Sequence, residues 1–300
     1  MAKTLIPFRL FPFTLYLLPE FFRTRESVIA IAASAKAKRV KISRIKDETI
    51  DVVNDTVARE FPLTIVLNGK ELVSLLCSPW DLDFLGVGFL FSAGMLHSRK
   101  EIERIHVDAA KGVVWIETTH KSDVPEGFAF RRLITSGCGK GIAFAKHIDG
   151  HLPKKISSNL SVATSEIFML MREFQSRSET YRTTGGVHSA GLCNKNGIIV
   201  FKEDIGRHSA IDKVLGECVL RGISTKNRVL ITSGRLSSEI VMKVASGQIP
   251  VLVSRSAPTD LGVRIAKNLG MTLVGFVRGY RMNIYSNPSR IKDTSPHKQE

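Results

Sequence analysis

One cysteine near the middle of the chain has the surroundings of a reactive thiol. Cys138 lies between Gly137 and Gly139, and Lys140 follows two residues later. Glycines leave room beside a thiol for another molecule, and a nearby cation favours the thiolate, the form that attacks sulfur or carbon. Glycine-rich surface loops with an incidental cysteine are also common, so this loop alone leaves both interpretations open.

Cysteine and histidine spacing argue against a disulfide framework and against zinc. The four cysteines fall at wide, irregular spacings, which indicates a reducing compartment. A zinc deaminase needs His-x-Glu and Cys-x-x-Cys. No histidine is followed two residues later by Glu, and no two cysteines have that spacing. We therefore expect no bound metal.

Four polar segments lie where predicted strands meet predicted helices. They are Thr184–Ala190, Glu203–His208, Ser233–Arg235 and Ser256–Thr259. Strand ends of this kind share one edge of a parallel sheet, and helix N-termini there favour anions. Each segment alone is equally explained by turn geometry or helix capping. Together they predict a crevice that is lined by Gly186, His188, Arg207, His208, Ser233, Arg235 and Thr259.

A fifth segment, Gly275–Arg281, ends the last strand that we predict. Arginines match phosphate geometry, and Phe276 or Tyr280 could stack on a base. A basic surface turn is the other interpretation. The candidate binding residues are Phe276, Val277, Arg278, Gly279, Tyr280 and Arg281.

The predicted elements that position these residues define an α/β fold. From Val187 onward, strands and helices alternate, which is typical of a mostly parallel sheet covered on both faces. Before that, strand pairs at 63–77 and 105–117 enclose a helix whose N-cap we predict to be Ser78. This part is therefore predicted to be a smaller α+β subdomain.

These patterns divide the chain into four parts. Residues 1–58 are expected to be a disordered basic and hydrophobic extension, 60–135 the N-terminal α+β subdomain, 136–286 the α/β core and 287–300 a disordered tail. Ordered structure should begin near Glu60. The apolar stretch at 5–22 is interrupted by Arg9 and prolines, so no membrane span is expected.

Charge suggests an anionic partner. The net charge is +15 and hydrophobic residues make up 43% of the chain. A basic surface attracts nucleic acid, nucleotide phosphates or acidic proteins. No RNA-recognition or helix-turn-helix motif is present, so nucleic acid is not the expected partner.

Taken in their order along the chain, the motifs resemble those of the formate dehydrogenase accessory sulfurtransferase family, FdhD. The matching segments are Thr135–Cys138, Thr184–His188, Glu203–Lys213, Ser233–Glu239, Ser256–Thr259 and Gly275–Tyr285. The resemblance spans residues 62–286. It implies a cytidine-deaminase-like fold without zinc, a homodimer and a cytoplasmic location. It also implies persulfide transfer from a cysteine desulfurase to the molybdenum or tungsten bis-molybdopterin guanine dinucleotide cofactor that formate dehydrogenase needs.

The resemblance assigns roles to two of the motifs. It makes Cys138 the catalytic, persulfide-bearing residue and Phe276–Arg281 the segment that binds the guanine dinucleotide. Many relatives have Cys-x-x-Cys in the loop, whereas the second position here is Gly141. That departure puts a two-cysteine mechanism in doubt and keeps a non-catalytic cofactor chaperone as the alternative. A deaminase-type hydrolase is disfavoured by the absent zinc ligands.

Overall fold

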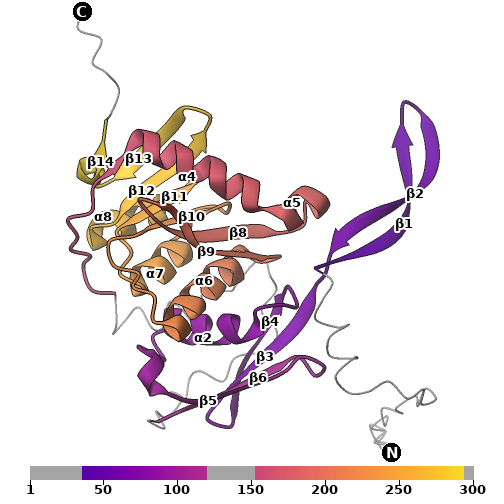
Figure 1. The fold of residues 1–300 in the computed structure, drawn as a ribbon, viewed down its shortest axis with the longest axis horizontal. Coiled ribbons are helices and arrows are strands. Elements are labelled where there is room, and N and C mark those ends of the chain that lie inside the picture. Colours follow the sequence, from indigo (N-terminus) through magenta and orange to yellow (C-terminus); the bar gives the residue numbers. More distant parts are fainter. Residues whose placement is uncertain (1–35, 120–152, 294–300) are drawn as a thin grey trace, which may run out of the picture.

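The computed structural model describes residues 36–119 and 153–293. Figure 1 shows a larger body around a six-stranded sheet, a smaller four-stranded sheet beside it and a two-stranded arm that projects from their junction. The predicted catalytic residue, Cys138, lies outside the described residues.

The six-stranded sheet is mixed. Its order is β13-β12-β11-β10-β8-β9, and only the β10–β11 and β11–β12 pairs are parallel. The expected mostly parallel sheet is therefore found only in its centre, because short turns join β8 to β9 and β12 to β13, and such turns connect antiparallel strands. The strands are β8 (His188–Asn194), β9 (Gly197–Asp204), β10 (Val229–Thr232), β11 (Val251–Ser254), β12 (Thr272–Arg278) and β13 (Arg281–Ser286).

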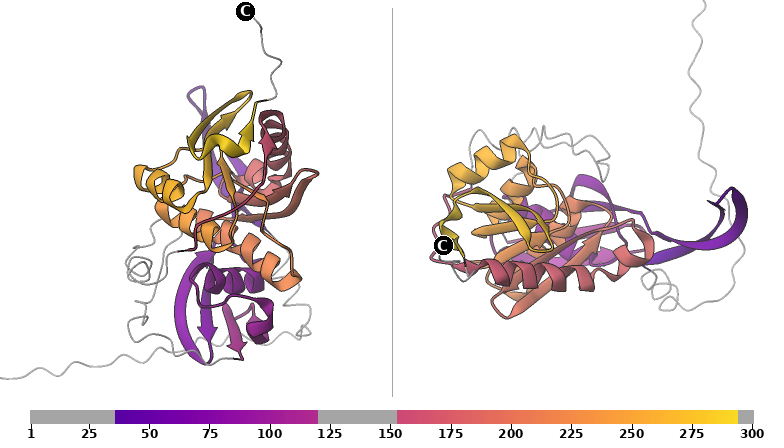
Figure 2. Two further views of the ribbon diagram at one scale, coloured as in Figure 1. Left: turned by 90° about the vertical axis from the view of Figure 1, so that its left-hand side faces the viewer. Right: turned by 90° about the horizontal axis from the view of Figure 1, so that it is seen from above.

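Helices cover both faces of this sheet, as predicted. Successive strand residues point to opposite faces, so Leu230 and Leu252 pack with α6, α7 and α8, whereas Ile231 and Val253 pack with α4. Figure 2 shows α4 on the side opposite the other three helices. The helices are α4 (Thr164–Arg177), α6 (Arg207–Arg221), α7 (Ser238–Ser246) and α8 (Asp260–Leu269).

The smaller sheet has its own apolar core. Its order is β4-β3-β6-β5, and helix α2 packs on it through buried side chains such as Leu85 and Leu90. The predicted strands and the helix are confirmed, with boundaries shifted by a few residues. The elements are β3 (Phe61–Leu67), β4 (Lys70–Cys77), α2 (Leu82–Ser92), the 3-10 turn η1 (Arg99–Glu101), β5 (Ile102–Asp108) and β6 (Val113–Thr118).

Helices α2 and α6 meet at two glycines. A Cβ at Gly88 would lie 1.8 Å from the carbonyl oxygen of Asp212, and one at Gly216 would lie 1.9 Å from that of Phe84. Only residues without side chains permit this backbone contact. The glycines thus join the smaller sheet to the larger body.

Two buried ion pairs fix the same junction. Lys213 Nζ lies 2.7 Å from Asp204 Oδ2, and Lys243 Nζ lies 2.8 Å from Asp212 Oδ2. Ser92, at the end of α2, donates its hydroxyl to Asp212 at 2.8 Å. Burial raises the pKa of both carboxyls, and the lysines oppose that shift. Each charge is therefore compensated inside the protein.

Ser78 is part of this junction and does not cap a helix. Helix α2 begins four residues later, after Asp81 in the left-handed conformation with φ 55°. The Ser78 N–H donates to Asp204 at 3.0 Å, and its hydroxyl accepts the N–H of Ile205 at 3.1 Å. The predicted N-cap is wrong because the Ser78 hydroxyl, which a cap would use, instead accepts a hydrogen bond from Ile205, which is remote in the sequence.

The arm corrects the expected disordered extension. Strands β1 (Ala37–Lys46) and β2 (Thr49–Ala58) pair antiparallel over their whole length. Asp47 and Glu48 make the turn with φ of 48° and 66°, the positive values that a two-residue hairpin turn requires. Both strands carry many charged residues, so their sequences lack the alternation of apolar and polar residues that indicates a half-buried strand. The rest of the predicted extension, 1–35, lies outside the described residues.

Small elements complete the described chain. They are β7 (Val162–Ala163), α5 (Glu179–Thr184), the 3-10 turn η2 (Pro288–Arg290) and β14 (Ile291–Lys292). Because β14 pairs with β7, the expected disorder from residue 287 is wrong as far as residue 293. In the part of the chain that the structure describes, no helix has the length and apolarity to cross a bilayer.

Candidate functional site

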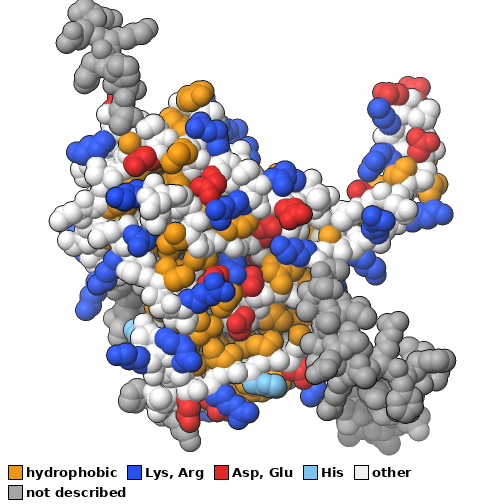
Figure 3. Space-filling view, in the orientation of Figure 1, with side chains coloured by type: hydrophobic (Ala, Val, Ile, Leu, Met, Phe, Trp, Pro, Cys, Tyr) orange, Lys and Arg blue, Asp and Glu red, His pale blue; other side chains and the backbone are white. Residues whose placement is uncertain are grey.

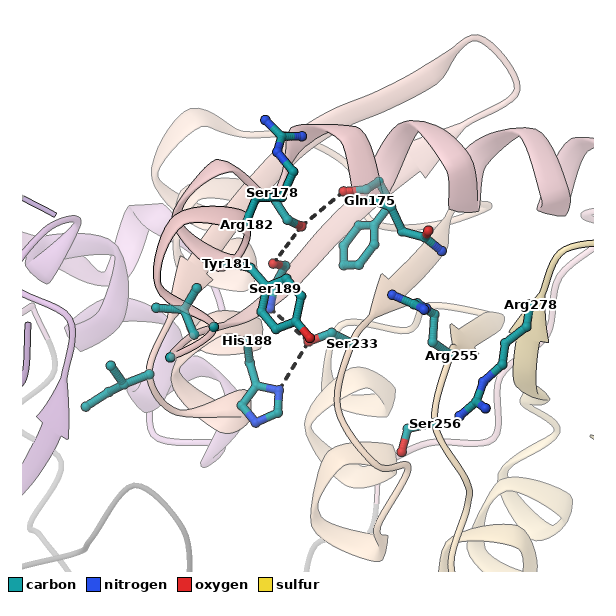
Figure 4. Close-up of a pocket in the computed structure, with 15 residues that line it drawn as sticks. Gln175, Ser178, Tyr181, Arg182, His188, Ser189, Ser233, Arg255, Ser256 and Arg278 are labelled. Carbon is teal, nitrogen blue, oxygen red and sulfur yellow. Dashed lines mark hydrogen bonds between the residues drawn. The ribbon is translucent and has the colours of Figure 1, made fainter. Parts of the chain in front are cut away.

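A cavity of about 670 Å³ opens at the edge where β10, β11 and β12 end. Its volume is within the range of small-molecule sites. Figure 4 shows polar side chains converging on it from several elements. The lining consists of Phe174, Gln175, Ser178, Tyr181, Arg182, Gly185, Gly186, Val187, His188, Ser189, Ile205, Ser233, Arg255, Ser256 and Arg278.

Strand direction explains why these residues meet. Strand β8 is antiparallel to β10, so its first residue, His188, lies beside the last residues of β10. Strand β9 returns along β8 and ends at the same edge, where Asp204 pairs with His188. An antiparallel strand thus contributes its beginning where the parallel strands contribute their ends, which brings distant motifs to one edge.

His188 is held by a serine that directly follows β10. Ser233 Oγ accepts the N–H of Ser189 at 3.0 Å and lies 3.2 Å from His188 Nδ1. Burial lowers the pKa of His188, and the charges of Arg207 and Arg235 lower it further. The imidazole is therefore neutral at neutral pH, so that Nε2 is free to act as a hydrogen-bonding group toward a ligand.

The cavity lining is cationic. Arg182, Arg255 and Arg278 contribute to it, and no residue of the described lining is acidic. Arg182 donates to the carbonyl of Ser176. Within the described residues, neither Arg255 nor Arg278 forms an ion pair. Guanidinium groups that lack a carboxylate partner favour an anion such as a phosphate.

Arg278 reaches the cavity through an irregular strand end. The β12–β13 register shifts between Gly275 and Arg278, and Phe276 has φ 54°, which is rare for a bulky residue. The Phe276 N–H donates to the carbonyl of Ser256 at 3.1 Å, so the strained bend is anchored to the loop after β11. Backbone strain of this kind concentrates at binding sites.

Two further features position the cavity rim. Buried Glu203 accepts the N–H groups of Thr180 at 3.3 Å and Tyr181 at 3.2 Å, and so fixes the start of α5. At the other end of α5, a Cβ on Gly186 would lie 2.9 Å from Cβ of Ala58 at the base of the arm. A larger residue at this rim position would displace the arm or the loop.

The predicted crevice residues fall into three groups. Gly186, His188 and Ser233 line the cavity. Arg207 and Arg235 are not among the lining residues, but their charges lower the pKa of His188, which lines the cavity.

His208 and Thr259 lie elsewhere. Thr259 caps α8 and accepts the N–H of Gly262 at 3.2 Å. His208 Nε2 lies 3.4 Å from Glu239 Oε2. Burial, followed by the charges of Lys243 and Arg207, lowers the pKa of His208 to about 3. The imidazole is neutral at pH 7, and the contact is not an ion pair there.

Of the predicted nucleotide-binding segment, only Arg278 is among the cavity-lining residues. Val277 is fully buried, and Phe276 is half-buried. Gly279, Tyr280 and Arg281 are exposed in the β12–β13 turn, where the Tyr280 ring packs edge-on against Phe168. Binding by the whole segment stays a prediction.

The described cysteines are poor nucleophiles. Cys77, Cys193 and Cys218 are buried, and burial raises the pKa of each thiol to about 12. Thiols with such pKa values are almost entirely protonated at neutral pH. Among the four cysteines of the chain, that leaves Cys138 as the candidate for thiolate chemistry. The described residues also contain no cluster of side chains that could hold a metal ion.

Sequence reasoning missed part of the lining. Gln175, Tyr181 and Arg182 come from α4 and α5, and α5 has no clear signal in the sequence. Arg255 could have been found, because it follows β11 directly and so lies at the same strand end as Ser256, which belongs to one of the predicted segments.

Comparisons with known proteins agree with the motifs. Residues 58–292 match the model of the FdhD/NarQ family. The chain is 38% identical to the sulfur carrier protein FdhD of Bacillus subtilis, with 83% of this chain and 95% of the relative covered. It is 40% identical to the Staphylococcus aureus protein of the same name, over 84% and 96%. A crystal structure of a candidate formate dehydrogenase accessory protein from Desulfotalea psychrophila superposes with a TM-score of 0.71 at 31% identity, covering 86% of this chain and all of that one.

Proposed function

This chain belongs to the FdhD/NarQ family, and on that premise we propose that it is a sulfur carrier that serves formate dehydrogenase. It accepts sulfur from a cysteine desulfurase and passes it to a molybdenum or tungsten bis-molybdopterin guanine dinucleotide, which is bound as substrate. The observation that carries the proposal is a cationic cavity in a chain in which three of four cysteines are buried, protonated thiols.

The first step is a thiol–persulfide exchange at Cys138. Its thiolate attacks the terminal sulfur of the donor's persulfide, the donor's S–S bond breaks, and the donor leaves as a thiolate. A new S–S bond remains on Cys138. The step needs one cysteine, so Gly141 in place of a second loop cysteine does not prevent it.

The cavity suits the nucleotide end of the cofactor. Arg255 and Arg278 can pair with the diphosphate, and neutral His188 can hydrogen-bond to base or sugar without adding charge. Phe174 and Tyr181 place aromatic rings in the same lining. The mixture of cationic, hydrogen-bonding and aromatic groups matches the chemistry of a guanine nucleotide.

Sulfur loading tests the proposal directly. The protein is incubated with a cysteine desulfurase and cysteine, and its intact mass is measured before and after reduction. We expect one reducible sulfur on the wild type and none on Cys138→Ala. Cys218→Ala is the matched control and should load normally.

The same variants separate the carrier from the alternative, a non-catalytic cofactor chaperone. Cys138→Ala should bind GDP as the wild type does, yet fail to support formate dehydrogenase activity. Full activity with this variant would contradict sulfur transfer and favour the chaperone. Loss of GDP binding as well would indicate a folding defect.

A further inference from the structure

Two hydrogen bonds to Ser189 fix the position of the Ser233 side chain beside His188. The Ser233 N–H donates to the carbonyl of Ser189 at 3.0 Å, and Ser233 Oγ accepts the N–H of Ser189 at 3.0 Å. The serine at the end of β10 is therefore held against the start of β8. Its hydroxyl oxygen lies 3.2 Å from His188 Nδ1, which is within hydrogen-bond distance.

The hydroxyl proton of Ser233 determines which nitrogen of the imidazole carries a proton. A hydroxyl supplies one donor, and a neutral imidazole has one N–H and one acceptor nitrogen. If the Ser233 O–H donates to His188 Nδ1, both groups are satisfied and the ring proton is on Nε2. The opposite tautomer would leave the Ser233 O–H without an acceptor in the described part of the chain, because its oxygen already accepts the N–H of Ser189.

In this arrangement, His188 presents a donor to the cavity that it lines. Burial and the charges of Arg207 and Arg235 lower the pKa of His188, so the ring has a single N–H at neutral pH. Figure 4 shows one ring nitrogen toward Ser233 and the other directed away from it. Among the described residues Nε2 has no hydrogen-bond partner, so its N–H is available to a ligand.

The order of the strands separates His188 from two arginines of the cavity. Arg255 directly follows β11 and Arg278 ends β12, and these strands are two and three places from β8 in the sheet. At about 4.8 Å per place, they lie roughly 10 and 14 Å from the strand that His188 begins. In a nucleotide the sugar separates the base from the diphosphate, so a diphosphate held by the arginines directs the base toward His188.

Positive charge alone does not select a base. On the face shown in Figure 3, Lys and Arg side chains are spread over the larger body, the smaller sheet and the arm, and the net charge is +15. Such a surface attracts any nucleotide, whichever base it carries. A fixed N–H distinguishes the purines, because guanine has an acceptor oxygen, O6, where adenine has an amino donor.

We propose that Ser233 fixes His188 in the tautomer with its proton on Nε2, and that this N–H binds O6 of the guanine base. Ser233 is thus a positioning residue, and His188 determines specificity for guanine over adenine. An N–H that faces the adenine amino group leaves two donors without an acceptor, which a desolvated site rejects. This role of His188 rests on the proposed function, because it takes the ligand to be a guanine nucleotide.

Nuclear magnetic resonance of the free protein tests the tautomer without any ligand. Long-range proton–nitrogen correlation spectra of the isotope-labelled full chain at neutral pH show which ring nitrogen carries the proton, and the His188→Gln spectrum assigns the signal. We expect a protonated Nε2 in the wild type and in Ser233→Thr, which keeps the hydroxyl. Ser233→Ala should show a mixture of tautomers. A proton on Nδ1 in the wild type would overturn the proposal.

Calorimetric titration tests the recognition of the base. The wild type should bind GDP about tenfold or more tightly than ADP. IDP, which keeps O6 but lacks the amino group of guanine, should also bind more tightly than ADP. Ser233→Ala should reduce the preference for GDP about fivefold, and Ser233→Thr should preserve it. Ser237→Ala, the same substitution in the same loop but outside the cavity lining, is the control and should leave the preference unchanged.

The contrary outcomes separate this role of His188 from the proposed function. Equal affinities of the wild type for GDP and ADP, or a preference unchanged in a folded Ser233→Ala, would overturn the role and leave the proposed function intact. A preference for GDP that IDP does not share would assign the discrimination to the amino group of guanine and overturn the contact with O6. Failure to bind either nucleotide would contradict the proposed function and the role of His188 together. Circular dichroism shows whether each variant is folded.

Discussion

The junction between α2 and α6 and the cavity at the sheet edge use charge in opposite ways. At the junction, Lys213 and Lys243 each have a buried carboxylate within 2.8 Å. At the cavity, Arg255 and Arg278 have no acidic partner among the described residues. Compensated charge in a core fixes one arrangement of the chain, whereas uncompensated charge at a rim is available to a ligand. Stability and binding should therefore respond to different substitutions.

The largest effect is expected from breaking a junction ion pair. Lys213→Met leaves Asp204 buried without its cation, and loss of one partner of a buried pair costs about 3–5 kcal/mol. Urea unfolding measures the loss, with Arg278→Ala as the control that should change stability by less than about 0.5 kcal/mol. Equal effects of the two substitutions would remove the distinction between junction and cavity.

A smaller loss of stability should follow from adding one methyl group at the helix crossing. Gly216→Ala places a Cβ in the space of the Phe84 carbonyl oxygen, and overpacking of this kind costs about 1–3 kcal/mol. Lys226→Ala, at an exposed position just after the same helix, is the control. If Gly216→Ala unfolds at the same urea concentration as the wild type, the close backbone contact does not exist.

At the cavity, binding should change while stability does not. Arg278→Ala removes a charge-assisted contact worth about 1.5 kcal/mol and should weaken GDP binding roughly tenfold. Arg281→Ala, three residues away but outside the cavity lining, should have a smaller effect. Calorimetric titration with GDP compares them. The reverse order would show that the β12–β13 turn, rather than the cavity wall, holds the nucleotide.

A further effect concerns the dependence of stability on pH, to which His208 contributes. The pKa of His208 is about 3 in the fold and about 6.5 in an unfolded chain, so between these values the unfolded state binds the extra proton. Stability should therefore fall as pH falls through this window, by up to about 1.4 kcal/mol per pH unit from this residue. His208→Gln should flatten the slope measured by urea unfolding between pH 4.5 and 6.5. An unchanged slope would assign the pH dependence to other groups.

Most strands and helices of the two sheets followed from local patterns. The segments at 229–232 and 251–254 are apolar runs between turn signals, and both form strands of the alternating region that was predicted from Val187 onward. The arm was missed because its strands carry charges on both faces and no core selects one of them. Helix α5 was missed because six residues held by Glu203 from another strand leave no periodic signal.

The candidate site, too, was predicted only in part from local patterns. His188, Ser233 and Arg278 could be chosen because each is a polar residue where a predicted strand begins or ends. Thr259 belongs to the same pattern, yet its hydroxyl is used by its own helix. A local pattern does not distinguish a cap from a cavity wall, because both place the same residue types at the same strand end.

By itself, the sequence determined the family, the order of the central elements and the one cysteine that has glycines on both sides, since these are properties of residue types and their spacing. The tertiary structure decided that β8 runs against β10, that Ser78 serves Asp204 instead of a helix, and that Arg255 faces the cavity whereas Arg281 does not. Each of these depends on groups far apart in the chain, whose hydrogen bonds and buried charges are satisfied only when the two sheets and their helices pack together.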